Sequence, residues 1–250
     1  MRGLGPVLLL GTALALVFSS CSVKEDRSDC PCMLVLDIGE AGRDSLFFAV
    51  QDEPSEFRFS DTLSGSVFRV PLPRRRVDCC FVWGGDCSPS GVEIPFGEQC
   101  PPLWMDACSL VPEGERVDYE VVLHKSYCRM TIDLSSADEA LSLMPSVRIY
   151  GNVCGYSFGG VPLAGPFSFD AAGRVCTVLL PRQMDSSLMM DISSGGVLRT
   201  FALGELLEAD GYDWSAPDLD DVSLFVDYAV TTLTLRIQDY LPEAPQEVVV

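Results

Sequence analysis

The side chains best suited to covalent or metal chemistry in this 250-residue chain belong to 11 cysteines and one histidine. Nucleophilic catalysis by a serine or cysteine needs a base, and the only imidazole is that of His124, at a predicted strand end beside Lys125. No two cysteines have the C-x₂-C spacing of a zinc knuckle, so a zinc site would need thiolates from scattered positions. The sequence therefore predicts a protein that is not an enzyme and binds no metal or cofactor.

Cys21 has a sequence context that no other cysteine shares. A basic start at Arg2 and an apolar run over residues 4–18 lead to Ser20-Cys21, which is the three-part form of an export signal. The run is short for a permanent membrane span, which needs ~20 apolar residues. The small residues before Cys21 resemble a lipobox, so we expect cleavage between Ser20 and Cys21, removal of residues 1–20 as a signal peptide, and acylation of Cys21, for example by palmitate. An ordinary secretory leader is the alternative.

A charged segment follows Cys21, and we expect residues 21–29 to form a lipidated tether. Lys24, Glu25 and Asp26 resemble the signal that directs lipoproteins of Bacteroides-type bacteria to the cell surface. The alternative is a solvated tether that carries no such signal. Lipid on Cys21 and this segment together predict a protein anchored in the outer membrane and exposed on the cell.

The remaining cysteines are even in number, which in an exported chain favours disulfide bonds. Adjacent strand residues point to opposite faces, so Cys79 and Cys80 are expected to bond different partners. The connectivity stays open, although the clustering of cysteines suggests that the turn-rich segment 84–115 is stapled. The disulfide candidates are Cys30, Cys32, Cys79, Cys80, Cys87, Cys100, Cys108, Cys128, Cys154 and Cys176.

The formal net charge is −19, from 36 acidic and 17 basic residues, and it argues against nucleic acid and anionic lipid surfaces as partners. Asp218, Asp220 and Asp221 form the acidic cluster that a calcium or sugar site would use first, but DLDD lacks the alternation of a calcium loop. A solvated turn before a strand is the favoured interpretation. The basic run Arg74-Arg75-Arg76 is predicted to be a solvated turn as well, with docking of an acidic partner as the alternative.

Short runs rich in Val, Leu, Phe and Thr recur between turn residues, which is typical of an all-β sandwich or barrel. The expected strands cover residues 33–38, 46–51, 56–60, 66–72, 77–83, 117–124, 127–134, 147–153, 174–180, 188–192, 197–203, 222–227 and 231–237. The segment between Trp83 and Val117 is rich in Gly, Pro, Ser and Cys and is predicted to be a long loop. Short helices are expected only over residues 136–141 and 203–210.

The length without the leader suits two β domains of ~100 residues each. We place their joint near residues 124–126, which gives an N-terminal domain over residues 30–124 and a C-terminal domain over residues 125–250. The tail over residues 241–250 contains prolines and then valines. It would add an edge strand or, if free, pair with the open sheet edge of a partner.

The order of these features resembles the FimB-like family of fimbrial anchor subunits. The resemblance covers the cysteine after the leader, Asp29-Cys30-Pro31 before the first strand, Leu123-His124-Lys125 before RMTIDL, and FVDY with TLTLRI near the end. The cysteine count is higher than this family leads us to expect. The resemblance implies two tandem transthyretin-like β-sandwich domains in a lipoprotein that fixes a fimbrium to the outer membrane and limits its length. Its partners would be fimbrial subunits.

Two functions remain open on the sequence alone. The first is a structural anchor that binds fimbrial subunits through a sheet edge. The second is a surface lipoprotein that binds glycans on the aromatic side chains of Trp83, Trp104, Tyr212 or Trp214. Such aromatic residues also serve as ordinary core packing.

Overall fold

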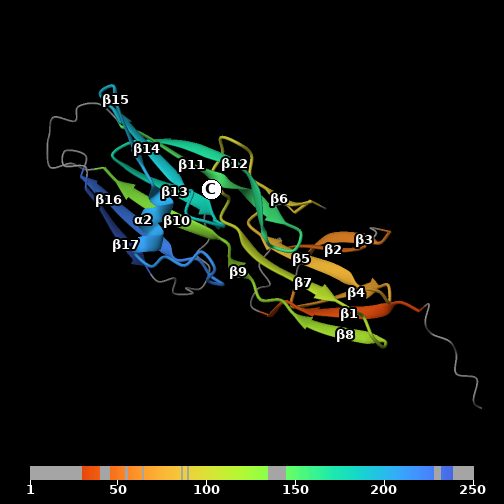
Figure 1. Cartoon of the computed structure of the whole chain (residues 1–250). Helices are drawn as coiled ribbons and strands as arrows, with labels where there is room; N and C mark the ends of the chain where they lie inside the picture. The colour runs from red at the N-terminus through yellow and green to blue at the C-terminus, as the bar shows by residue number, and fades with distance from the viewer. Residues whose placement is uncertain are drawn as a thin grey trace, which may run out of the picture.

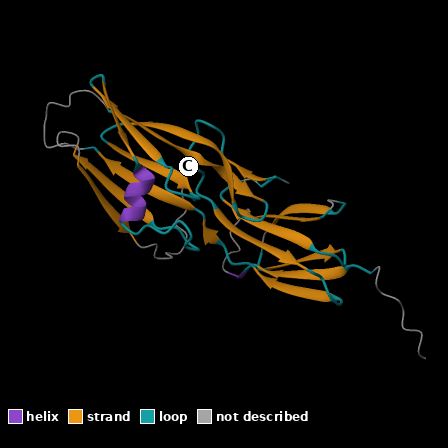
Figure 2. Cartoon of the chain, viewed as in Figure 1, coloured by secondary structure: helices purple, strands orange, loops and turns teal. Residues whose placement is uncertain are grey.

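The computed structural model is almost entirely β-sheet (Figures 1 and 2) and describes residues 30–39, 46–53, 56–63, 65–85, 87–88, 90–134, 145–227 and 232–238. For residues 227 and 232–238 only the backbone is described. Four sheets form two pairs that lie end to end in an elongated molecule (Figure 1). The all-β fold predicted from the sequence is confirmed.

The first sheet pair contains a three-stranded sheet of order β4-β1-β8 and a five-stranded sheet of order β3-β2-β5-β7-β9. Leu34, Phe48, Val70 and Phe81 belong to the apolar core between these two sheets. Its strands are β1 Cys32–Asp37, β2 Leu46–Asp52, β3 Arg58–Leu63, β4 Val67–Leu72, β5 Val77–Trp83, β7 Trp104–Leu110, β8 Arg116–Glu120 and β9 His124–Lys125.

The second sheet pair contains a sheet of order β13-β10-β16-β17 and a sheet of order β12-β11-β14-β15, to which the short strand β6 is added through β11. Met130, Ile149, Phe167 and Leu224 belong to its core. Its elements are β6 Gly91–Glu93, β10 Tyr127–Asp133, β11 Ser146–Ser157, β12 Pro162–Ala172, β13 Val175–Pro181, β14 Met189–Ser194, β15 Val197–Phe201, α2 Leu203–Ala209, β16 Asp221–Asp227 and β17 Thr232–Gln238.

The two sheet pairs share one strand connectivity. In the first, β1 pairs antiparallel with β4 and parallel with β8, and in the second, β10 pairs antiparallel with β13 and parallel with β16. In the facing sheets, β2 lies between β3 and β5 while β5 contacts β7, and likewise β11 lies between β12 and β14 while β14 contacts β15. The same order of pairing therefore occurs twice along the chain.

The inner strand β5 is buried on both of its faces. Cys79 and Phe81 point into the core of the first sheet pair, whereas Cys80 and Val82 belong to a separate apolar cluster on the other side. That cluster is completed by Val92 and Leu103 from the β5–β7 connection and by side chains of β11 and the turn after it. Burial on both faces explains why β5 reads as a nearly continuous apolar run.

The prediction of one long loop between Trp83 and Val117 is wrong. This segment holds β6, β7 and the first residue of β8, and β7 is a full strand of the five-stranded sheet. A further strand, β12, was missed because Pro162, Gly165 and Pro166 interrupt its apolar pattern. The helix expected over residues 203–210 is confirmed as α2. The helix expected over residues 136–141 and the tail over 241–250 lie outside the described residues.

Candidate functional site

The joint between the sheet pairs is built around a buried lysine. Lys125, in β9, is 2% exposed, and its Nζ donates hydrogen bonds to the Leu219 carbonyl at 2.8 Å and to Asp221 Oδ1 at 2.5 Å. The same carboxylate oxygen accepts a hydrogen bond from the Arg129 backbone N–H at 3.0 Å. A buried ammonium is tolerated only when it is paired and hydrogen-bonded, and here the partners come from the loop before β16 and from β16 itself.

Asp218 adds a second polar contact across the same joint. Its Oδ1 accepts a hydrogen bond from the Lys125 backbone N–H at 2.7 Å, and its Oδ2 lies 3.3 Å from Nδ1 of His124. The prediction that DLDD is simply a solvated turn is therefore wrong for Asp218 and Asp221. These carboxylates and the single histidine connect the two sheet pairs.

Tyr156 of β11 forms a third polar contact. Its side chain is fully buried, its hydroxyl donates to the Ser126 carbonyl, and it accepts a hydrogen bond from the Arg182 backbone N–H at 2.7 Å. Burial raises the pKa of the Tyr156 hydroxyl, which keeps it protonated as a donor. Ser126 follows β9 directly, so this hydroxyl fixes the chain at the point where it passes into the second sheet pair.

Strand β6 provides the apolar half of the joint. It lies in the connection between β5 and β7 of the first sheet pair, but it pairs with the end of β11 in the second. The two backbones approach closely at two glycines with positive φ, Gly91 at +119° and Gly155 at +151°. A Cβ on Gly91 would lie 1.9 Å from the Tyr156 carbonyl oxygen, and a Cβ on Gly155 would lie 2.1 Å from that of Val92. Only glycine fits at these positions.

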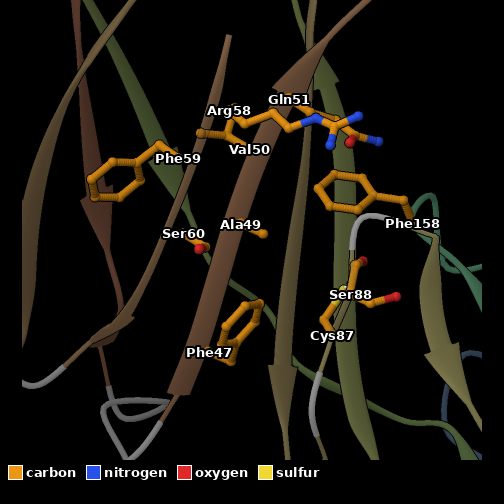
Figure 3. A pocket seen from close by; sticks show the side chains of 10 residues that line it. All are labelled: Phe47, Ala49, Val50, Gln51, Arg58, Phe59, Ser60, Cys87, Ser88 and Phe158. Atoms are coloured by element: carbon orange, nitrogen blue, oxygen red, sulfur yellow. Dashed lines mark hydrogen bonds between the residues drawn. The ribbon is translucent and has the colours of Figure 1, made fainter. Parts of the chain in front are cut away.

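A shallow hollow of about 170 Å³ lies beside this apolar contact (Figure 3). Figure 3 shows Phe47 and Ala49 of β2 on one side, Phe158 and Cys87 on the other, and the Arg58 side chain across one end. The lining offers apolar surface, the Arg58 cation and the Cys87 thiol. This arrangement suits contact with an apolar or weakly acidic group.

The aromatic residues proposed as sugar platforms fall into two groups. Trp104 is half-buried and packs edge-to-face on both Trp83, at 6.4 Å between ring centroids, and Tyr127, at 6.5 Å. Tyr212 is buried, and Trp214 packs against it at 4.6 Å and is half-buried, as Trp104 is. Trp214 packs against the core of the second sheet pair, whereas Trp104 fills the space between the sheet pairs.

The arginine triplet contacts residues of its own sheet pair. Arg74 Nε donates to the Cys30 carbonyl at 2.8 Å, and Arg75 pairs with the buried carboxylate of Asp52 and with Glu56. Arg76 donates to Ser109 Oγ at 3.2 Å. The triplet is largely exposed, and it holds the residues just before β1 and the β4–β5 turn in place.

The predicted lipidation and export residues, Ser20, Cys21, Lys24, Glu25 and Asp26, lie outside the described residues and stay predictions. The ten disulfide candidates are described as thiols, and they are buried except for exposed Cys30 and half-buried Cys108, Cys154 and Cys176. Two pairs come into contact: Cys80 with Cys87, whose sulfur atoms are 3.4 Å apart, and Cys79 with Cys108 across adjacent strands. Within the described residues, no three His, Cys, Asp or Glu side chains form a group able to hold a metal ion.

The outer end of the second sheet pair presents an apolar sheet edge. Strand β15 is the last strand of its sheet in the described chain, and Val197 and Leu198 in it are 51% and 63% exposed. Ser146, where β11 starts, pairs with Ser193 beside the β14–β15 turn, while the far end of β11 pairs with β6 at the joint. Val197 and Leu198 therefore lie at the end of the molecule farthest from the first sheet pair (Figure 1).

The architecture defines an all-β protein made of two sandwich-like sheet pairs with a polar and an apolar contact between them. No helix in the described residues combines the length and apolar character that a membrane crossing requires. Neither a scan against known protein families nor a search of curated proteins finds a match.

Several solved structures share this fold. A proposed polysaccharide-binding protein from Bacteroides thetaiotaomicron is 11% identical, with a TM-score of 0.59, over 86% of this chain and 100% of the other. The fimbrial anchor protein Mfa2 from Porphyromonas gingivalis is 10% identical, with a TM-score of 0.54, over 84% and 98%. A proposed adhesin from B. thetaiotaomicron is 13% identical, with a TM-score of 0.54, over 84% and 97%. At such identities the likeness establishes a shared fold.

Proposed function

We propose that this protein is a non-catalytic anchor subunit that attaches a fimbrium to the bacterial outer membrane and limits its length. The observation that carries the proposal is the fold shared with the fimbrial anchor protein Mfa2 along nearly the whole of both chains. The lipobox-like cysteine of this sequence adds the attachment that an anchor needs. In this proposal the chain forms two tandem transthyretin-like domains, over residues 30–124 and 125–250, each of which supplies most of one sheet pair.

Acyl chains on Cys21 hold the base of the molecule in the membrane. Each buried methylene contributes ~0.8 kcal/mol, and two or more chains are needed for stable attachment. Strand β1 runs parallel to β8, whose end leads toward the joint, so β1 begins at the outer end of the first sheet pair. The start of β1, which follows the proposed tether in the sequence, therefore lies at the end opposite to β15 (Figure 1).

The fimbrial subunit binds at the β15 edge. The exposed apolar side chains of Val197 and Leu198 provide a surface that a subunit can bury on binding. Lipid at one end and a subunit-binding edge at the other give the protein the polarity that a membrane anchor requires. The acidic surface, with a net charge of −19, repels anionic lipid headgroups and keeps the sheet pairs away from the bilayer.

The anchoring half is tested by replacing Cys21 in the native strain. A Cys21→Ser strain is expected to shed fimbriae into the medium, as is a strain without the gene. Cys30→Ser, which removes an exposed thiol beyond the tether, is the matched control and is expected to keep fimbriae on the cells. The proposal fails if fimbriae stay attached and keep their normal length in the strain without the gene.

The subunit-binding half is tested by a charge at the β15 edge. Leu198→Asp is expected to leave the protein in the membrane but to release fimbriae, because a carboxylate cannot be buried against an incoming apolar strand. Val122→Asp alters a side chain of similar exposure, 50%, in the first sheet pair, and it is expected to retain them. Equal retention in both strains would exclude the β15 edge as the subunit site.

A second function, glycan binding at the cell surface, is favoured by the fold shared with the proposed polysaccharide-binding protein, and the half-buried Trp214 is the aromatic side chain that would stack on a sugar. Arg182 fixes this loop through hydrogen bonds from its Nη1 to the Trp214 carbonyl at 2.5 Å and to the Ala216 carbonyl at 2.6 Å. Glycan-array binding that is lost in Trp214→Ala and kept in Trp104→Ala would support it. An array without signal would leave the anchor as the function.

A further inference from the structure

Strand β5 carries two adjacent cysteines whose side chains enter different environments. Cys79 points into the core of the first sheet pair, where Cys108 of β7 packs against the same cluster. Cys80 points to the opposite face and shares a cluster with Cys87 from the β5–β7 connection. Each β5 thiol therefore has one thiol neighbour on its own side of the sheet.

The geometry of both pairs suits a covalent bond. Cys79 and Cys108 are directly opposite in the antiparallel β5–β7 register. Such positions have Cα atoms ~4.5–5.5 Å apart, within the ~4.4–6.8 Å that a disulfide spans. The Cys80 and Cys87 sulfur atoms are 3.4 Å apart, so a small side-chain adjustment brings them to the ~2.05 Å of a disulfide.

The thiols of each pair also differ in their readiness to react. The hydrogen bond between the two sulfur atoms raises the pKa of Cys80 and lowers the pKa of Cys87. The contact between Cys79 and Cys108 acts in the same way, raising the pKa of Cys79 and lowering that of Cys108. The thiolate is the attacking species in disulfide exchange, so Cys87 and Cys108 are the first to react.

We propose that the exported protein carries two disulfide bonds, Cys79–Cys108 and Cys80–Cys87, one on each face of β5. The inference rests on the proposed export, because disulfides persist in the periplasm and on the cell surface and are rare in the cytosol. It assigns partners for four of the cysteines and explains why this chain has thiols at two consecutive positions of one buried strand.

The oxidant is the disulfide of a periplasmic thiol–disulfide oxidoreductase. The Cys87 thiolate attacks one sulfur of that disulfide, which forms a mixed disulfide and releases the other sulfur as a thiolate. The Cys80 thiolate then attacks the Cys87 sulfur, forming the Cys80–Cys87 bond and releasing the second oxidant sulfur. The oxidoreductase ends as a dithiol, having gained the two electrons and two protons lost by the cysteines. Cys108 and Cys79 follow the same sequence.

The Cys80–Cys87 bond has a consequence for the joint. Cys87 lies at the start of the segment that carries β6 onto β11, and it lines the hollow next to Phe158 (Figure 3). A bond to β5 fixes this segment over the face of the five-stranded sheet. The bond therefore stabilises the apolar contact between the sheet pairs, whereas Cys79–Cys108 stabilises only the first pair.

The test is a thiol map of the full-length protein isolated from its native membrane. Free thiols are alkylated under denaturing conditions before reduction, and the newly released thiols then receive a second label that is located by tandem mass spectrometry. We expect the second label on Cys79, Cys80, Cys87 and Cys108. If these four cysteines carry the first label, the inference is overturned.

Single variants distinguish this connectivity from the alternative in which Cys79 bonds to Cys87 and Cys80 bonds to Cys108. Cys87→Ser is expected to free Cys80 and leave Cys79 bonded, and Cys108→Ser is expected to free Cys79 and leave Cys80 bonded. The opposite pattern overturns the assignment. Cys176→Ser, on β13 of the second sheet pair, is the control and is expected to leave all four bonded. If a variant fails to accumulate, the map of the unaltered protein still decides whether the four cysteines are oxidised.

The same sample separates failure of this inference from failure of the anchor proposal. Mass spectrometry of the N-terminal peptide reports whether Cys21 is acylated. An acylated Cys21 with four free thiols would overturn the disulfides and leave export intact. A chain with an uncleaved leader and free thiols would count against both, because export is their shared premise.

Discussion

The two sheet pairs repeat one strand connectivity, but they differ at one connection between equivalent strands, which is β5 to β7 in the first pair and β14 to β15 in the second. In the second pair, β14 and β15 are joined by a tight turn at Gly195-Gly196. In the first pair, the equivalent strands β5 and β7 are separated by residues 84–103, which contain β6 and two cysteines. The extra chain of the first pair is used to contact the second.

The comparison shows how two similar units are made into one elongated body. The β5–β7 connection supplies a strand and apolar side chains to the joint, and Lys125, Asp218 and Asp221 supply a buried polar contact beside it. The β14–β15 turn of the second pair makes no comparable contact within the described residues, and the residues of β15 are exposed or half-buried. For the anchor proposed above, the joint is the part that would transmit load, and the exposed Val197 and Leu198 of β15 offer apolar surface to a partner.

The largest effect is expected from breaking the polar half of the joint. Asp221→Ala leaves the buried Lys125 ammonium without its carboxylate, which is expected to cost ~3–5 kcal/mol in the free energy of unfolding. Lys125→Met removes the charge together with the need for a partner and is expected to cost less. Urea denaturation measures both. A smaller loss for Asp221→Ala than for Lys125→Met would show that the ion pair does not hold the joint.

The second-largest loss of stability is expected from a change in the apolar half of the joint. Gly91→Ala places a Cβ 1.9 Å from the Tyr156 carbonyl oxygen, at a φ of +119°, so β6 must move away from β11. Gly97→Ala is a matched control because its φ is +92° and a Cβ there meets nothing within 4 Å. Backbone strain alone costs ~1–3 kcal/mol, and we expect the loss in the free energy of unfolding to be clearly larger for Gly91→Ala than for Gly97→Ala. Hydrogen exchange should show faster exchange of the β6 amides only in Gly91→Ala.

A smaller loss is expected from Tyr156→Phe, which removes the hydroxyl that joins Ser126 to Arg182. Two buried backbone groups then lose a partner, at a cost of ~1–3 kcal/mol. Tyr119→Phe is the control, since its hydroxyl bonds Asp106 at 2.9 Å within the first sheet pair. In double variants with Asp221→Ala, Tyr156→Phe should be coupled in stability and Tyr119→Phe should be additive. Additivity in both would mean that the joint is not one cooperative unit.

The sequence predicted most of the strands. Strands such as β2, β5 and β10 have alternating or continuous apolar runs, and such a run indicates a buried strand without information from the rest of the chain. It missed β7, where aspartate and cysteine lie in a segment otherwise filled with turn residues, and it missed β12 with its prolines. The sequence predicted a domain joint near residues 124–126, but it gave no indication of the contacts that Lys125 makes. The carboxylate that pairs with Lys125 is that of Asp221, 96 residues further along the chain, so no local sequence pattern indicates this contact. The boundaries of the two proposed domains stay predictions.

The smallest effect is expected far from the joint, at the exposed pair of Arg148 and Asp170 on β11 and β12. The Arg148 guanidinium holds the pKa of the Asp170 carboxyl below its ordinary value. A carboxyl with a lowered folded pKa stabilises the protein above its unfolded pKa of ~3.9, and this contribution is lost as the pH falls through the folded pKa. Solvent screens the pair, so Asp170→Asn should lower Tm by less than ~2 °C at neutral pH and leave it unchanged in acid. A shift as large as that of Asp221→Ala would contradict the view that buried contacts of the joint, and not surface ion pairs, hold the molecule together.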